Sequence, residues 1–315
     1  MVSRPSRKQI AFGFIAIAIV GAISLFAYNK RDLPAQNTTY LASGSALDLA
    51  VLDGIVNADK DYPKKDDGIV KAVVVPHHLV ASKSIALGIK AMASSSLNRV
   101  VIISPDHFFR CQKMLCTTDG NFESFFGKTT ISKQDVEELK KSEDVVESSE
   151  LFSNEHGIYT IVPFIKHYIP NAKIVPIVVS QNGTGSEQDR TKILKLLKTL
   201  LSKNGVGLVI SSDFSHYLPL KESDQIDVKT QNSFCSGNSQ EILTLKNPEQ
   251  SDCPLCLWIL EQTAKELGFW NPNLVIHTNS ANLMNDTSVK ETTSHFTFTL
   301  LATDTTNSCP IMKND

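Results

Sequence analysis

The sequence has little net charge and lacks the basic clusters typical of proteins that bind nucleic acid. Its 315 residues carry a formal net charge of −2. In the body of the chain, no cluster of Lys and Arg is interleaved with aromatic residues. Because a protein that neutralises phosphates needs such a basic field, we expect no nucleic-acid partner.

Two sequence signatures of common site types are also missing. No Gly-x-Ser-x-Gly segment occurs, so the nucleophile elbow of a serine hydrolase is not indicated. Ser212 and Ser215 lie beside His216 in the sequence, but such adjacency does not predict triad geometry. Only one CxxC is present, at Cys253-Pro-Leu-Cys256, which disfavours a structural zinc site made of four cysteines.

Long apolar runs are missing from the body of the chain, but one occurs at the N-terminus. Residues 10–28 are 19 uncharged residues that follow Arg4, Arg7 and Lys8. A bilayer core of about 30 Å needs about 20 such residues in a helix. A signal peptide has a shorter apolar run, about 7 to 15 residues, with small residues at its cleavage site. We therefore expect an uncleaved membrane anchor within residues 1–30, with the folded domain on the extracytoplasmic side.

An extracytoplasmic body changes the interpretation of the six cysteines, because disulfides persist outside the cytosol. Cys111 and Cys116 have four residues between them and predict a local disulfide. Cys253 and Cys256 allow a redox pair, half a zinc site, or one metal ligand beside a structural cysteine. Cys253 could also pair with one of the other two cysteines, whereas a ligand must be a free thiolate.

The rest of the chain predicts one globular domain. Hydrophobic residues make up 42% and charged residues 20% of the sequence, which is ample for a core. Residues 31–45 have linker composition, and we place the domain at 46–305 with a tail at 306–315. Short apolar strands alternate with helices, and strands that are apolar throughout are buried on both faces. The pattern predicts an α/β fold, a three-layer α/β/α sandwich with a mostly parallel central sheet.

The expected elements follow one another along the domain without an internal repeat. The strands are expected at 69–75, 100–103, 174–179, 206–211, 274–278 and 295–302. The helices are expected at 82–95, 132–141, 156–168, 188–203, 239–245 and 255–267.

Three of these strands are each followed directly by a loop that contains histidine. The loops are Pro76-His77-His78, Ser104-Pro-Asp-His107 and Ser212-Asp-Phe-Ser-His216. In an open α/β sheet, ligands bind outside the carboxyl ends of the strands, where such loops converge. Imidazole is the commonest protein ligand for transition metals. The pattern predicts that His77 or His78, together with His107 and His216, reaches one metal ion.

The remaining histidines give weaker signals. Glu155-His156 stands at the start of a predicted helix, whose N-terminus would lower the pKa of the imidazole and favour its neutral form. A simple capping role accounts for the same position. His167, His277 and His295 have no partner signal in the sequence, and we assign them no site role.

Taken together, several segments resemble the Memo family, called AmmeMemoRadiSam system protein B in bacteria and archaea. They are Ala72-Val-Val-Val-Pro-His-His78, Ile103-Ser-Pro-Asp-His107, Glu155-His-Gly-Ile158, Pro163-Phe164 and Ser211-Ser-Asp-Phe-Ser-His216. The resemblance covers about residues 46–305. It implies a fold similar to the class III extradiol dioxygenases, which are non-haem iron enzymes, and a site for iron or copper.

The resemblance also implies a ligand set. His77, His107 and His216 match the family's histidines. The family's ligand set also includes a cysteine before a late helix, and Cys253 matches it best, with Cys256 as the second choice. The chain departs from the family pattern at three positions: Ser104 and Pro254 stand where glycine is usual, and Tyr159 stands where an acidic residue is usual. These changes indicate a divergent member.

Our leading hypothesis is a membrane-anchored, Memo-like protein that binds one redox-capable ion, iron or copper, and has non-haem oxidoreductase or dioxygenase-like activity on an unidentified small molecule. Asp213, Glu155 and His156 would orient ligands or act as acid and base groups. One alternative is a zinc hydrolase with Glu155 or Asp213 as the base. Another is a non-catalytic binding module at the cell surface, which the missing acidic residue at Tyr159 favours.

Overall fold

The computed structural model describes residues 38–61, 68–182, 185–302 and 309. The predicted membrane span at 10–28 lies outside the described residues, as do most of the 31–45 stretch and the 306–315 tail. Within the described ranges, no helix combines the length and the apolar character needed to cross a bilayer.

The main sheet has eight strands in the order β10-β11-β2-β9-β3-β8-β4-β7. Its centre consists of four parallel neighbours: β2 (Ile69–Val75), β9 (Val206–Ser211), β3 (Arg99–Pro105) and β8 (Lys173–Val179). Antiparallel contacts flank this centre, and the outer strands are β11 (Ser294–Ala302), β10 (Pro272–Asn279), β4 (Leu115–Thr117) and β7 (Val145–Glu147). The fold is therefore α/β with a mixed sheet whose centre is parallel.

A second, three-stranded sheet joins the start of the described chain to the middle of the sequence. It contains β1 (Thr39–Leu41), β5 (Asn121–Ser124) and β6 (Gly127–Thr129). Tyr40 on β1 packs against Phe122, with ring centroids 4.9 Å apart, and its hydroxyl is 2.6 Å from the hydroxyl of Thr118. Residues 31–45, which the sequence analysis interpreted as a linker, thus include a strand whose Tyr40 side chain is buried.

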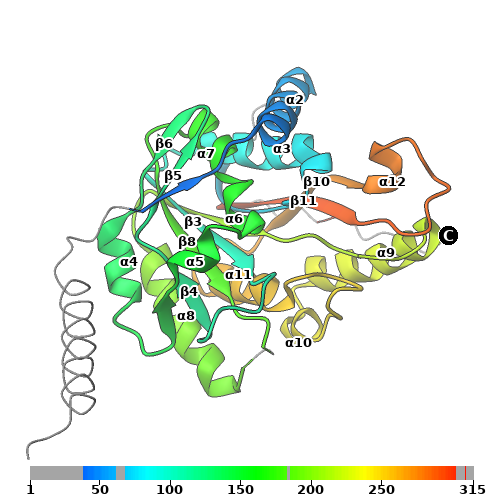
Figure 1. Ribbon diagram of the computed structural model, residues 1–315. Helices are drawn as coiled ribbons and strands as arrows, with labels where there is room; N and C mark the ends of the chain where they lie inside the picture. The colour runs from blue at the N-terminus through cyan, green and yellow to red at the C-terminus, as the bar shows by residue number, and fades with distance from the viewer. Residues whose placement is uncertain (1–37, 62–67, 183–184, 303–308, 310–315) are drawn as a thin grey trace, which may run out of the picture. The chain divides into compact units, whose positions relative to one another are not determined.

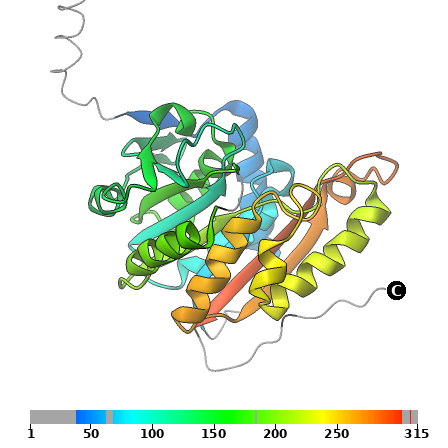
Figure 2. The ribbon, with the colours of Figure 1, turned by 90° about the horizontal axis from the view of Figure 1, so that it is seen from below.

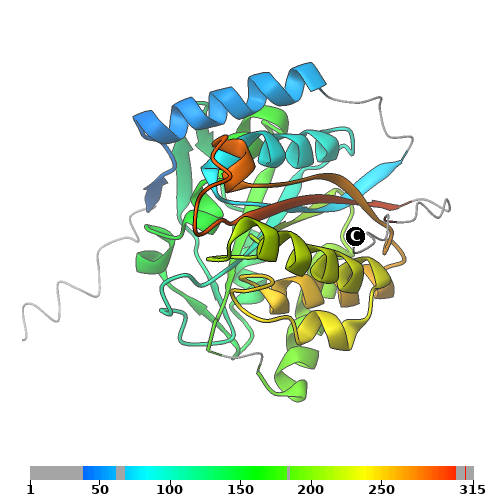
Figure 3. The same cartoon turned by 90° about the vertical axis from the view of Figure 1, so that its right-hand side faces the viewer.

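Helices cover both faces of the main sheet (Figures 1 and 3). One face carries α2 (Ser45–Asp61), α3 (Ser82–Ala93) and α7 (Val162–Tyr168). The other carries α8 (Glu187–Leu201), α9 (Leu220–Ser236), α10 (Ser239–Leu243) and α11 (Pro254–Glu266), which lie in front of the sheet in Figure 2. The short helices are η1 (Leu79–Ala81), α4 (Lys133–Leu139), α5 (Ser149–Phe152), α6 (His156–Tyr159) and α12 (Ser280–Leu283).

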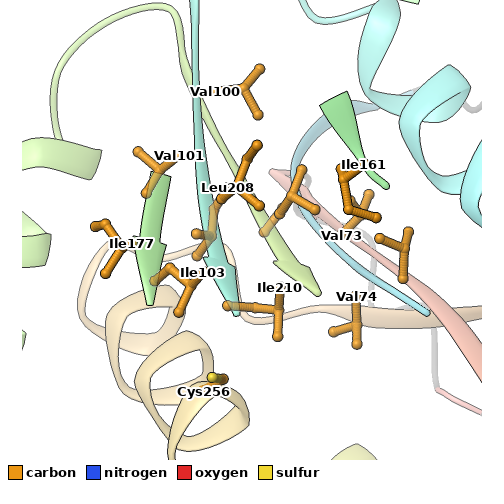
Figure 4. Close-up of a cluster of buried hydrophobic side chains, with 14 of the residues drawn as sticks. Val73, Val74, Val100, Val101, Ile103, Ile161, Ile177, Leu208, Ile210 and Cys256 are labelled. Atoms are coloured by element: carbon orange, nitrogen blue, oxygen red, sulfur yellow. The ribbon is translucent and has the colours of Figure 1, made fainter. Parts of the chain in front are cut away.

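The core lies between the sheet and these helices, as the uninterrupted apolar strands predicted. Val100, Val101 and Ile103 on β3 are fully buried, and so are Leu208 and Ile210 on β9 (Figure 4). Each such side chain contributes about 1.5–3 kcal/mol through burial. The rigid centre fixes the strand ends where the polar loops begin.

The cysteines of the described residues form three disulfides. Cys111 pairs with Cys116, as the spacing predicted. The other two pairs are Cys235–Cys309 and Cys253–Cys256. No free cysteine occurs among the described residues.

Candidate metal centre

The parallel centre of the sheet brings the three predicted histidine loops to one place. Because β9 lies between β2 and β3, the loop with His77 and the loop with His107 flank the loop that contains Asp213. Backbone pairing of Val75 with Ser211 aligns the ends of β2 and β9. The prediction that these loops converge at the carboxyl ends of the strands is therefore confirmed.

His77 lies at the centre of the cluster and is almost fully buried. Its Nδ1 is 3.1 Å from the Ser211 hydroxyl. Its Nε2 is 3.3 Å from Asp213 Oδ2 and 3.2 Å from Asp252 Oδ2. Burial opposes a positive charge on the ring, but the two carboxylates outweigh it and raise the pKa of His77.

His107 is held by Glu155, the N-cap residue of α6. His107 Nδ1 donates to Glu155 Oε1 at 2.6 Å, and the backbone N–H of His107 donates to Oε2 at 3.1 Å. The other ring nitrogen, Nε2, faces Asp252 Oδ2 at 3.6 Å. Although burial opposes the charged ring, Asp252 and Glu155 raise the pKa of His107 to about 10. Glu155 therefore fixes the ring so that Nε2 points into the cluster.

Close packing at Gly157 sets the position of the Glu155 loop. The Gly157 N–H donates to Glu155 Oε1 at 3.0 Å. A Cβ at this position would lie only 1.9 Å from the Ser104 hydroxyl and 3.0 Å from the Ser104 Cβ. Glycine is therefore required for α6 to approach the end of β3 this closely.

His156 completes the imidazole group from the solvent side. Its ring centroid is 3.9 Å from that of His107 and 5.0 Å from that of His77. Burial, together with these two neighbouring rings, lowers the pKa of His156 to about 4. This partly exposed imidazole is consequently neutral near pH 7.

Two buried carboxylates face the imidazoles. Asp252, from the loop before α11, accepts from the Ser212 hydroxyl at 2.7 Å and from the Asp213 N–H at 3.2 Å. Asp213 Oδ1 accepts from His295 Nδ1 at 2.8 Å. Burial alone would raise the pKa of both carboxyls, but the adjacent His77 lowers each well below its usual range.

These side chains form two overlapping groups. Within each group, the potential ligand atoms all lie within 4.8 Å of one another. One group is His77, His107 and His156, and the other is His77, Asp213 and Asp252. Ligand atoms about 2.1 Å from an ion are about 3.0–3.4 Å apart in octahedral or tetrahedral geometry. The observed separations of 3.2, 3.3 and 3.6 Å between Nε2 and Oδ2 atoms are close to this range. The donor set fits a divalent cation.

Comparison with known protein families matches residues 39–291 to the family described as Memo-like protein. The chain belongs to the Memo family. Similar MEMO1 family proteins occur in Pyrobaculum aerophilum, 27% identical over 58% of this chain and 66% of that protein, and in Thermoplasma volcanium, 26% identical over 68% and 80%. The match thus spans just under two thirds of the length of the Pyrobaculum relative.

Among solved structures, an uncharacterized protein from Escherichia coli K12 has 14% identity and a TM-score of 0.45 over 73% of this chain and 99% of that one. That similarity is too low to carry an argument.

The structure does not bring two predicted ligands of the Memo-like site into these groups. His216 lies outside both, and its Nδ1 is buried with no hydrogen-bond partner among the described residues. Cys253 forms a disulfide with Cys256, and a disulfide sulfur is not the thiolate that a metal requires. Among the described residues, the cluster therefore offers nitrogen and oxygen donors.

Sequence reasoning missed Asp252 and His295. Asp252 stands directly before Cys253, where Ser251-Asp252 also suits the start of a helix, so its position gave no distinct signal. His295 lies within β11 and was assigned no site role, yet its ring is fully buried against Asp213. Both residues reach the site through the tertiary fold.

Proposed function

We propose that this Memo family protein binds one redox-capable ion, iron, through Nε2 of His77, Nε2 of His107 and the carboxylate of Asp252. The observation that carries the proposal is the position of Asp252 Oδ2, which lies 3.2 Å from His77 Nε2 and 3.6 Å from His107 Nε2. Two histidines and one carboxylate are typical of non-haem iron(II) oxygenases. A donor set without thiolate disfavours copper(I), which prefers sulfur ligands.

The charges of the buried cluster support a resident cation. Asp213, Asp252 and Glu155 are all buried and carry lowered pKa values, because protonated imidazoles stand beside them. A divalent ion would supply the same positive charge while His77 and His107 release their protons. The cluster is therefore electrostatically matched to a metal ion.

When bound, such an ion would activate oxygen or polarise an oxygen atom of a small molecule. Glu155 would keep His107 in the tautomer with a free Nε2, and the Ser211 hydroxyl, 3.1 Å from Nδ1, would orient His77. His156 is neutral near pH 7 and partly exposed, so it can accept a proton from a molecule at the site.

Exposed aromatic side chains next to the histidine loops support an aromatic small molecule as the substrate. Phe109 and Tyr217 are 67% and 66% exposed; Phe109 lies two residues after His107, and Tyr217 directly follows His216 in the loop that also carries Asp213. Both have left-handed backbone conformations, with φ of 53° and 60°, which cost about 1–3 kcal/mol each. Such strain is common at functional sites, and we propose oxidation of an aromatic diol or a related compound.

The geometry weighs against the hydrolase alternative. Glu155 and Asp213, the carboxylates considered as bases, are already occupied by His107 and His295. Hydrolysis at a zinc ion would therefore depend on His156 as the base.

Three disulfides support the proposal that the domain is extracytoplasmic, because cytosolic reductants would keep such thiols reduced.

Oxygen uptake tests the proposed oxidation. The full-length chain would be loaded with iron(II) and supplied with a panel of catechols and other aromatic compounds. We expect uptake that is lost in His107→Ala and Asp252→Ala and kept in His167→Ala, a change on the exposed surface. Iron binding without uptake for any compound would favour the non-catalytic binding module instead.

A further inference from the structure

Asp252, the carboxylate of the proposed iron site, lies in a loop that two amide side chains from outside the site hold in place. On the basis of the proposed function, we propose that Gln181 and Asn247 are positioning residues. They fix the backbone at Asp252 so that its carboxylate can share an ion with the two histidines.

The two amides hold the backbone carbonyl of Asp252 between them. Gln181 Nε2 donates to this carbonyl at 2.6 Å, and Asn247 Nδ2 donates to it at 2.9 Å. Asn247 Nδ2 also donates to Gln181 Oε1 at 2.9 Å, so each amide orients the other. The two amides and the carbonyl therefore form a closed triangle of hydrogen bonds.

The helix that follows Asp252 does not bond to this carbonyl. Cys253 is the N-cap residue of α11, and the first backbone bond of the helix runs from the Leu257 N–H to the Cys253 carbonyl at 3.2 Å. The Asp252 carbonyl therefore precedes the helical ladder and needs donors from elsewhere in the fold. Gln181, which follows the end of β8, and Asn247, from the loop between α10 and α11, supply these donors.

The side chain of Asp252 makes the contacts of the iron site, so the position of its backbone matters. Asp252 Oδ1 accepts from the Ser212 hydroxyl at 2.7 Å. Oδ2 lies 3.2 Å from His77 Nε2 and 3.6 Å from His107 Nε2. A displacement of about 1 Å at a ligand is enough to weaken a metal site. Donors that fix the carbonyl therefore also fix the distance from the carboxylate to both imidazoles.

Other hydrogen bonds hold the loop itself, so the amides can be tested separately from its folding. The N–H groups of Gln250 and Ser251 both donate to the Lys246 carbonyl, at 2.8 and 3.3 Å. Asn247 is exposed and Gln181 is only partly buried, so replacing them opens no cavity in the core. We expect the loss of both amides to move the carboxylate without unfolding the loop.

An anaerobic competition titration of the full-length chain with iron(II), against a chromophoric chelator, measures the effect. Gln181→Met keeps the length of the side chain and removes its donor, and Asn247→Ala removes the other donor. Each single variant leaves the carbonyl one donor, so we expect each to weaken iron(II) binding by less than about 10-fold. The double variant should weaken binding by about 10- to 100-fold. Asn182→Ala, an exposed change beside Gln181, should bind as the wild type does.

The visible absorption of the cobalt(II)-loaded chain separates positioning from a general loss of structure, because these bands depend on ligand geometry. We expect the bands to shift in the double variant and to stay unchanged in Asn182→Ala. A lowered urea midpoint of the metal-free double variant, with the iron affinity and cobalt bands of the wild type, would overturn the positioning role and leave the iron site intact. No iron binding by the wild type would overturn the iron site itself, and this role with it.

Discussion

Replacing Gly157 with alanine should destabilise the protein, although alanine is the better helix former. The added Cβ would lie 1.9 Å from the Ser104 hydroxyl and 3.0 Å from the Ser104 Cβ. Rotation of the hydroxyl would relieve the first contact but break its bond to the Pro105 carbonyl, worth about 1 kcal/mol. The second contact would remain. Overpacking of this kind costs about 1–3 kcal/mol, against a helical gain of at most about 1 kcal/mol.

Urea denaturation of the metal-free, full-length chain measures this change. We expect Gly157→Ala to lower the free energy of unfolding by about 1–2 kcal/mol. Ser104→Ala in the same chain should recover part of the loss, because it removes the hydroxyl alone. Ser104→Gly should recover most of it, because it removes both contacts. Unchanged stability of Gly157→Ala, or equal losses with and without Ser104→Gly, would refute the steric argument.

Three further predictions concern the site and its surroundings. Glu155→Gln should weaken iron(II) binding about 10- to 100-fold in a competition assay, because His107 loses its orienting carboxylate, whereas exposed Glu150→Gln should bind normally. Burial raises the pKa of Asp135, but contacts with Lys203, Ser132 and Arg99 outweigh it and lower this pKa. The ion pair between Lys203 and Asp135 therefore stabilises the protein above about pH 4, and this stabilisation is lost below it. Lys203→Met should therefore cost about 1 kcal/mol at pH 7 and progressively less in acid; a constant difference across urea titrations from pH 7 to pH 2 would contradict this. The double variant Cys253→Ser, Cys256→Ser should lose about 2 kcal/mol of stability and keep its iron, while loss of iron would show that Cys253 is a ligand after all.

The sequence predicted the elements whose residues are uniformly apolar. Strands β2, β3, β8 and β9 were located to within two residues, because burial on both faces leaves an uninterrupted run. Helix α9 was missed for the opposite reason: apart from Phe234, its buried residues are polar, namely Ser223, Asp227, Thr230 and Gln231. Hydrophobic periodicity cannot detect such a face.

The candidate site shows the same limit. His77, His107 and Asp213 could be placed together because they follow neighbouring parallel strands. The predicted helix at 156–168 is two helices, α6 and α7, so the Glu155 side chain reaches His107 through a local turn. Asp252 and His295 come from distant segments and carry no motif. Spacing alone could not decide between a disulfide and a thiolate at Cys253.

The most direct test of the proposed iron site is the metal content of the full-length chain, purified without a metal-chelating tag and reconstituted anaerobically with iron(II). The wild type should hold iron, and the His77→Ala, Asp252→Ala double variant should lose about one ion per chain. His167→Ala should match the wild type. Equal iron in the wild type and the double variant, or no iron in the reconstituted wild type, would contradict the account.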